Sequence, residues 1–172
     1  MNAKPKSLTR SVVTGGCGFV GAPLVRQLLQ RGEEVLVLDS FGVGGPERLP
    51  DHPRLVVRQV DIRDTGAVGD LMNRFGPSVV YHLAAIHFIP YCNEHPEEAL
   101  EVNVRGTQSV IDAVSGAGER GMVFVSSAAV YPPSLQPLSI IFPSLLPWSR
   151  LSVDWQIPWV CIIWDPWPGP WL

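Results

Sequence analysis

Three evenly spaced glycines near the start of the chain constrain its fold more than any other feature. Gly15, Gly18 and Gly21 follow a short β-prone run, 11–14, and open a segment, 18–31, whose apolar residues recur at helical spacing. Small residues are required where a tight turn leads from a strand into a helix, because the two backbones pass close to each other. The pattern therefore predicts a strand, a turn and a helix as the first unit of an α/β fold.

The same alternation of strand and helix patterns continues to residue 125. The predicted strands are 35–38, 55–60, 79–82 and 122–125, and the predicted helices are 65–75 and 96–114. In the last helix, we expect Leu100, Val104, Val110, Ile111 and Val114 to face inward. Strands separated by helices pair in parallel through right-handed crossovers. We therefore expect a doubly wound parallel sheet, the Rossmann fold, with strand order 3-2-1-4-5, truncated after about five strands.

The composition changes between residues 131 and 140. All six tryptophans lie between Trp148 and Trp171, and nine of the seventeen prolines lie at or after Pro132. This part has no sustained period of 3.6 or 2, and its prolines would interrupt a long helix or a central strand. We divide the chain into an N-terminal extension (1–10), a truncated dinucleotide-binding domain (11–139) and an irregular Pro/Trp-rich tail (140–172).

The origin of this tail has two interpretations. A shifted reading frame, a retained intron or a misplaced gene end would explain the abrupt change in composition, and we favour this interpretation. The alternative is a genuine segment that binds a groove on a partner protein.

Bulk properties exclude several classes of function. The net charge of −3 and the hydrophobic content of 46% indicate a globular protein without a preference for nucleic acid or membrane surfaces. The three cysteines lie far apart, so the sequence predicts neither a metal site nor a disulfide framework. The polar first ten residues do not resemble a secretory signal, and no apolar run is long enough to span a bilayer. We expect a cytoplasmic protein.

The glycine-rich turn is suited to binding the pyrophosphate of a dinucleotide. The helix that follows it offers unpaired N–H groups and the positive end of its dipole. Asp39 ends the next predicted strand, where a carboxylate can accept hydrogen bonds from ribose hydroxyls and would repel a 2′-phosphate. NAD is therefore favoured over NADP. A structural turn with a surface aspartate is the alternative.

Four further segments follow the glycine-rich turn in a characteristic order. Thr14–Gly21 reads T-G-G-C-G-F-V-G, and the others are V-D-I-R-D (60–64), H-L-A-A (82–85), N-V-R-G-T (103–107) and V-S-S-A-A-V-Y (125–131). Together they resemble the extended short-chain dehydrogenases/reductases, in the NAD-dependent epimerase/dehydratase family that acts on nucleotide sugars. The resemblance covers about residues 11–131, and its motifs are specific for the family but not for the substrate.

The resemblance implies NAD as the cofactor and a nucleotide sugar as the substrate. It places these residues beside the cofactor: Gly15, Gly18, Phe19, Val20, Gly21, Asp39, Ser40, Asp61, Ile62, Leu83, Ala84, Ala85, Asn103 and Ser126. Asp61 and Ile62 would border the adenine. Three local alternatives stay open. Asp61 could cap the following turn, and Asn103 could simply hydrogen-bond neighbouring backbone. His82 is better explained as a histidine with satisfied hydrogen bonds at the end of a strand than as a proton carrier.

This sequence contains only some of the catalytic groups of the family that it resembles. In that family a tyrosine is the general base, and a lysine four residues later lowers its pKa. Ser127 matches the serine or threonine that hydrogen-bonds the same substrate hydroxyl, although it could be an ordinary strand-end serine. The Tyr-x-x-x-Lys pair is absent, because Tyr81, Tyr91 and Tyr131 lack a lysine four residues on and no lysine follows Lys6.

The sequence therefore predicts the NAD-binding portion of a nucleotide-sugar epimerase/dehydratase-type oxidoreductase that is not catalytically complete in this chain. The alternatives are a catalytically silent module that binds NAD or docks on a partner, a non-functional fragment, and a reductase acting on another substrate. A sheet ending at the fifth strand would expose a hydrophobic edge. We expect poor solubility and association through that edge, for example as a homodimer.

Overall fold

A six-stranded sheet forms the centre of the computed structural model, which describes residues 9–116, 121–125 and 161–164. Its strand order is β3-β2-β1-β4-β5-β6. The first five strands are parallel: β1 (Arg10–Thr14), β2 (Glu34–Asp39), β3 (Leu55–Gln59), β4 (Val79–His82) and β5 (Gly121–Val125). The predicted order 3-2-1-4-5 is confirmed.

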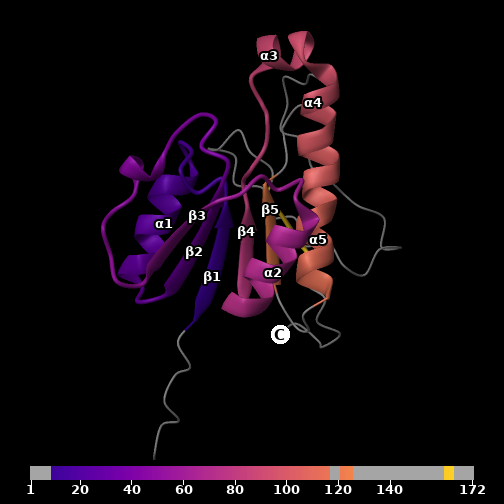
Figure 1. Ribbon diagram of the computed structural model, residues 1–172. Helices are drawn as coiled ribbons and strands as arrows, with labels where there is room; N and C mark the ends of the chain where they lie inside the picture. The colour runs from indigo at the N-terminus through magenta and orange to yellow at the C-terminus, as the bar shows by residue number, and fades with distance from the viewer. Residues whose placement is uncertain (1–8, 117–120, 126–160, 165–172) are drawn as a thin grey trace, which may run out of the picture.

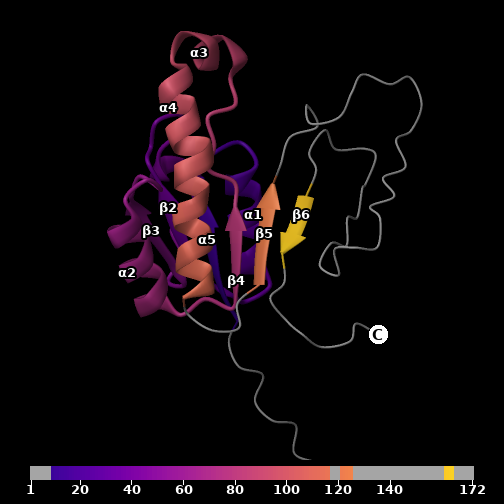
Figure 2. The same ribbon diagram turned by 90° about the vertical axis from the view of Figure 1, so that its right-hand side faces the viewer.

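The sixth strand, β6 (Cys161–Trp164), was not predicted from the sequence. It pairs antiparallel with β5 (Figure 2). A run of four residues is too short to show a period, and it lies between Pro158 and Pro166, which leaves room only for a short edge strand. The prediction of an unpaired edge at β5 is therefore wrong for the described residues.

The helices cover both faces of the sheet. They are α1 (Gly21–Gln30), α2 (Thr65–Phe75), α3 (Ile89–Glu94), α4 (Pro96–Leu100) and α5 (Thr107–Ser115). Helix α1 covers one face, and α2 and α5 lie side by side on the other (Figures 1 and 2). This layering is the doubly wound arrangement predicted from the alternation of elements.

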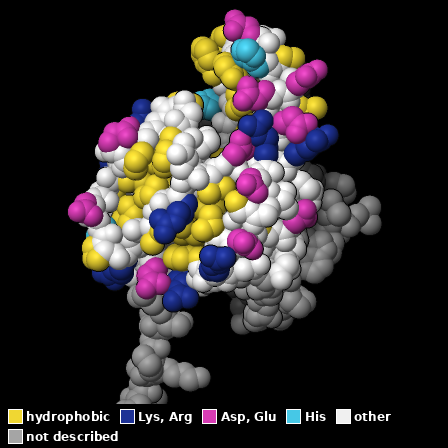
Figure 3. All heavy atoms as spheres, in the orientation of Figure 1, with side chains coloured by type: hydrophobic (Ala, Val, Ile, Leu, Met, Phe, Trp, Pro, Cys, Tyr) yellow, Lys and Arg dark blue, Asp and Glu magenta, His cyan; other side chains and the backbone are white. Residues whose placement is uncertain are grey.

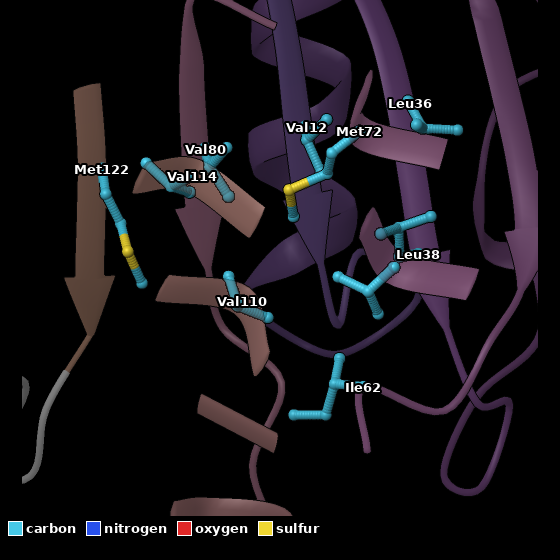
Figure 4. Packing of buried hydrophobic residues seen from close by; sticks show 10 residues of the cluster. Val12, Leu36, Leu38, Ile62, Met72, Val80, Val110, Val114 and Met122 are labelled. Carbon is cyan, nitrogen blue, oxygen red and sulfur yellow. The ribbon is translucent and has the colours of Figure 1, made fainter. Parts of the chain in front are cut away.

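Two hydrophobic cores follow from the alternation of side chains along the strands. On β1, Val12 points into the core under α2 and α5, and Val13 into the core under α1. Figure 4 shows the first core, formed by Val12, Leu36, Leu38, Ile62, Val68, Met72, Val80, Val110, Val114 and Met122. Full burial of each such side chain stabilises the fold by roughly 1.5–3 kcal/mol.

Local signals explain where helix α2 begins and ends. The Asp64 carboxylate accepts a hydrogen bond from the Ala67 N–H at 2.9 Å, which caps the first turn. Gly76 ends the helix with φ +63°, in the left-handed region that favours glycine. Helix α1 begins three residues later than the predicted segment, because residues 15–20 form the turn that leads into it.

The long helix predicted over 96–114 is interrupted. A π-helical segment, Glu101–Gly106, separates α4 from α5. The α4 end rises beyond the sheet, and hydrophobic side chains gather at this tip (Figures 1 and 3). Leu100 and Val104 are 63% and 56% exposed, so the prediction that they face inward is wrong. Among the described strands, none extends as far as this part of the helix (Figure 1).

Within the described residues, no helix is long and apolar enough to cross a membrane.

Candidate cofactor-binding site

The parallel strands bring the predicted site residues to one edge of the sheet. In the strand register, Thr14 lies beside Leu38 on one side and His82 on the other. The carboxyl ends of β1, β2 and β4 therefore meet where the strand order reverses. Crevices at this position bind ligands in open α/β sheets.

The glycine-rich loop is built around two close backbone approaches. Gly15 has φ +69°, and a Cβ atom there would lie 2.8 Å from the backbone nitrogen of Ala84. A Cβ at Gly21 would overlap the carbonyl oxygen of Gly15 and lie 2.7 Å from the Cα of Gly16. Glycine is therefore required at both positions, as the spacing predicted.

The loop presents unpaired donors at the start of α1. Among the described residues, the backbone N–H groups of Phe19 and Val20 have no acceptor. Both residues are solvent-exposed, and the Phe19 side chain is 91% exposed. Two free N–H groups at the positive end of a helix dipole suit a bound anion such as a pyrophosphate. The residues present thus fit the phosphate part of a dinucleotide.

Asp39 ties the glycine-rich loop to the segment after β2. Its Oδ2 atom accepts a hydrogen bond from the Cys17 N–H at 2.9 Å, and its Oδ1 accepts from the Phe41 N–H at 2.8 Å. Ser40, beside it, is exposed. Each carboxylate oxygen can accept more than one hydrogen bond, so the carboxylate retains capacity for a ligand hydroxyl.

Cys17 lies within the glycine-rich loop but is unsuited to act as a nucleophile. Its side chain is fully buried. Burial, with the nearby Asp39 carboxylate as the next cause, raises the pKa of the Cys17 thiol to about 11. The thiol is therefore protonated at neutral pH, and the thiolate is the reactive form.

The loop after β4 is held from beneath by Thr14. The Thr14 Oγ1 atom accepts hydrogen bonds from the N–H groups of Leu83 at 3.2 Å and Ala84 at 3.3 Å. Ala85 is exposed at the edge of the sheet. The backbone of Ala84 thus lies close to Gly15. The expected approach of this loop to the cofactor stays a prediction.

His82 is buried and held on both sides by hydroxyl groups. Its Nδ1 atom lies 2.7 Å from Thr14 Oγ1, and its Nε2 atom lies 2.9 Å from Thr107 Oγ1. Burial lowers the pKa of His82 from 6.5 to about 4. The ring is therefore neutral at physiological pH, which agrees with the interpretation as a satisfied histidine.

The structure places the predicted adenine-bordering residues in local interactions. Asp61 accepts a hydrogen bond from the Arg63 N–H at 2.9 Å, and it forms an ion pair with the Arg63 side chain. This hydrogen-bonded guanidinium lowers the pKa of the Asp61 carboxyl. The Ile62 side chain is 4% exposed and packs in the core near Gly106, so a contact with adenine would fall to its main chain.

Asn103 binds the main chain of the loop after β4. Its Oδ1 atom accepts from the Ile86 N–H, and its Nδ2 donates to the Ile86 carbonyl, both at 2.8 Å. The alternative that Asn103 hydrogen-bonds backbone therefore holds for its side-chain amide. The backbone it contacts belongs to a loop that is distant in sequence. Ser126 and Ser127 lie outside the described residues.

Sequence reasoning missed two threonines of the site. Thr14 and Thr107 both contact His82, and each stands inside a quoted motif, T-G-G-C-G-F-V-G or N-V-R-G-T. The two motifs contain both threonines, so the sequence did offer a signal for them. Their role was not recognised, because a threonine hydroxyl indicates a site residue only when its hydrogen-bond partner in the fold is known.

Comparisons with known proteins point to one family. Residues 11–144 match the NAD dependent epimerase/dehydratase family. A UDP-glucose 4-epimerase of Corynebacterium glutamicum is 31% identical over 85% of this chain and 45% of its own length. A 3 beta-hydroxysteroid dehydrogenase/Delta 5-->4-isomerase of Mycobacterium tuberculosis is 38% identical over 72% of this chain and 33% of its own length.

A solved structure leads to the same group of proteins. The UDP-glucose 4-epimerase of Thermus thermophilus in complex with NAD has a TM-score of 0.60 and 36% sequence identity. The match covers 64% of this chain and 35% of that protein. The chain thus spans less than half the length of each of these three relatives.

Proposed function

This chain belongs to the NAD dependent epimerase/dehydratase family, and from that premise we propose that its glycine-rich loop and strand ends bind NAD. The observation that carries the proposal is the pair of free N–H groups, of Phe19 and Val20, at the start of α1, in the loop whose Cys17 N–H donates to the Asp39 carboxylate. The N–H donors suited to phosphate and the carboxylate suited to ribose hydroxyls therefore lie in segments joined by one hydrogen bond, from Cys17 to Asp39.

Each group has a separate role in this proposal. The N–H groups of Phe19 and Val20 donate to the pyrophosphate. Asp39 accepts from the adenosine ribose and disfavours a 2′-phosphate. Leu83, Ala84 and Ala85 pass beside the cofactor, and Asn103 positions that loop through Ile86. When bound, NAD supplies a hydride acceptor.

The proposed substrate of the complete enzyme type is a nucleotide sugar. This follows from the relatives named as UDP-glucose 4-epimerases, although the steroid dehydrogenase relative keeps a non-sugar substrate as an alternative. Ser127 is proposed to hydrogen-bond the reacting hydroxyl. Because a lysine-assisted tyrosine base is absent from the sequence, we propose that this chain binds NAD without turning over a sugar.

Calorimetric titration of the full chain with NAD tests the proposal. We expect saturable binding of NAD, weaker binding of NADP, and no conversion of UDP-glucose to its 4-epimer when the sugar nucleotide is added. Because epimerisation returns the hydride to the sugar and leaves no net NADH, formation of the epimer is the readout that would instead identify a complete enzyme. Absence of NAD binding together with absence of cooperative unfolding would favour the non-functional fragment.

Asp39→Asn removes the charge and keeps the shape. Because both Asp39 oxygens accept backbone N–H groups, the variant also exchanges one of these acceptors for an NH2 group, so it tests the ribose contact together with the anchoring of the glycine-rich loop. We expect NAD affinity to fall about tenfold, since hydrogen bonds to charged groups contribute about 1.5–3 kcal/mol. The preference for NAD over NADP should narrow. Asp51→Asn is the matched control, because Asp51 is exposed and its replacement removes the same charge outside the site. Equal losses in both variants would argue against a specific role for Asp39.

A further inference from the structure

A continuous line of hydrogen bonds connects the glycine-rich loop to the helix on the far side of β4. It runs from Thr14 through the His82 ring to Thr107, and from Thr107 to the Asn103 carbonyl at 2.8 Å. The Asn103 side chain then holds Ile86 in the loop after β4. The loop after β4 is thus hydrogen-bonded to this network, and the glycine-rich loop follows directly from its first member, Thr14.

The proton positions in this network follow from the number of hydrogens available. A threonine hydroxyl has one proton, and that of Thr107 is donated to the Asn103 carbonyl. Thr107 Oγ1 can therefore only accept at His82 Nε2, which places the ring proton on Nε2. The unprotonated Nδ1 atom must then accept the proton of the Thr14 hydroxyl at 2.7 Å.

The remaining hydrogen-bonding capacity of the Thr14 hydroxyl is also used. Its two hydroxyl lone pairs accept the N–H groups of Leu83 and Ala84, and the Leu83 N–H is shared with the Thr14 carbonyl oxygen at 3.1 Å. The ring is held further by Phe124 of β5, which stacks on it with centroids 5.6 Å apart and an interplanar angle of 19°. A second ring proton, on Nδ1, would meet a Thr14 oxygen that has no free lone pair.

We propose that His82 is a positioning residue: fixed as the neutral Nε2–H tautomer between Thr14 and Thr107, it couples the start of helix α5 to the loop 83–86, whose Ala84 backbone lies close to Gly15. The tautomer forces Thr14 to act as a donor toward the ring, which leaves both its lone pairs for Leu83 and Ala84. The effect on cofactor affinity rests on the proposed binding of NAD, whereas the tautomer itself does not.

The first measurement is the tautomer of His82 in the full chain. Long-range ¹H–¹⁵N correlation spectra of protein with ¹⁵N-labelled histidine distinguish protonated from unprotonated ring nitrogens, with His82 assigned through its backbone. We expect protonated Nε2 and unprotonated Nδ1, unchanged between about pH 5 and pH 8. A protonated Nδ1, or a doubly protonated ring in that range, overturns the proposal.

Thr107→Val removes the acceptor at Nε2 and keeps the branched shape. We expect a detectable Nδ1–H population, faster amide exchange of Leu83 and Ala84 relative to global unfolding, and about threefold to tenfold weaker NAD binding, the size of one lost hydrogen bond. Thr107→Ser, which keeps the hydroxyl, should restore all three. Thr65→Val is the matched control, because Thr65 is an exposed threonine outside the network.

The outcomes separate this proposal from the proposed function. If the tautomer and the exchange respond to Thr107→Val but the wild-type chain binds no NAD, the coupling stands and the proposed function fails. If Thr107→Val lowers only global stability and leaves the tautomer and the exchange unchanged, the coupling is refuted. If Thr107→Val does not fold, the tautomer of His82 in the wild type and in Thr107→Ser tests the coupling instead. Nδ1 protonated in either protein would refute it.

Discussion

Alanine at Gly21 and at Gly69 should change stability in opposite directions. At Gly21 the added methyl would overlap the carbonyl oxygen of Gly15 and lie 2.7 Å and 2.9 Å from the Cα and C atoms of Gly16. All three atoms are backbone, so no side chain can rotate away. The start of α1 and the loop would have to separate by roughly 1 Å to reach ordinary contact distances.

Overpacking of this kind costs about 1–3 kcal/mol, which exceeds the gain of at most about 1 kcal/mol from replacing glycine in a helix. At Gly69, within α2, an added Cβ would have no atom within 4 Å beyond its own helix and chain neighbours. Gly69→Ala should therefore stabilise the chain by about 0.5–1 kcal/mol.

Urea unfolding followed by far-UV circular dichroism measures both effects in the full chain. Because the gain from replacing glycine in a helix is common to both variants, their difference should equal the overpacking cost, about 1–3 kcal/mol, which is above the error of comparing midpoints at a shared slope. A Gly21→Ala variant as stable as Gly69→Ala would refute the close approach on which the glycine-rich loop depends.

Two further predictions concern buried titratable groups. Because burial lowers the pKa of His82 from 6.5 to about 4, the unfolded chain binds more protons between these values, and the free energy of unfolding should fall by up to about 3 kcal/mol as the pH is lowered through this range. Urea unfolding of wild type and His82→Gln at several pH values tests this, and parallel pH profiles would contradict it. Cys17, buried and with a pKa raised to about 11, should react with iodoacetamide at neutral pH far more slowly than the half-buried Cys92. Peptide mass spectrometry of the labelled chain measures both rates, and equal rates would show that the loop opens readily.

The fold was largely predictable because the central strands β1 and β2 are buried along almost their whole length. The run at 35–38 is continuous and apolar, the run at 79–82 begins with two valines, and each has strong turn or helix signals on both sides. The π-helical segment at 101–106 was not predictable, since its residues continue an ordinary helical pattern. Tertiary context decides there which side chains reach the sheet, and so Leu100 and Val104 were misassigned.

The candidate site was predictable where backbone geometry restricts the residue type. Gly15 and Gly21 belong to this class, because a side chain at either position meets main-chain atoms. Asp39 was identified from its place at the end of a strand. Its hydrogen bond to Cys17 was not predicted, because the spacing along the chain does not show which loop faces which carboxylate.

Hydrogen bonds, in addition to the apolar contacts of Cys17, Leu83 and Ala84, hold the loops of this site in place. The loop residues Phe19 and Ala85 are exposed and contribute little to the cores beneath them. The groups that fix the loops stand behind them: Asp39 holds the glycine-rich loop, and Thr14 and Asn103 hold the loop after β4. A buried polar network of this kind specifies one geometry when every member is satisfied, and a single missing partner is costly. Loss of one hydroxyl behind the loops should therefore disturb cofactor binding more than loss of an exposed side chain on them, although the hydroxyl itself does not face the cofactor.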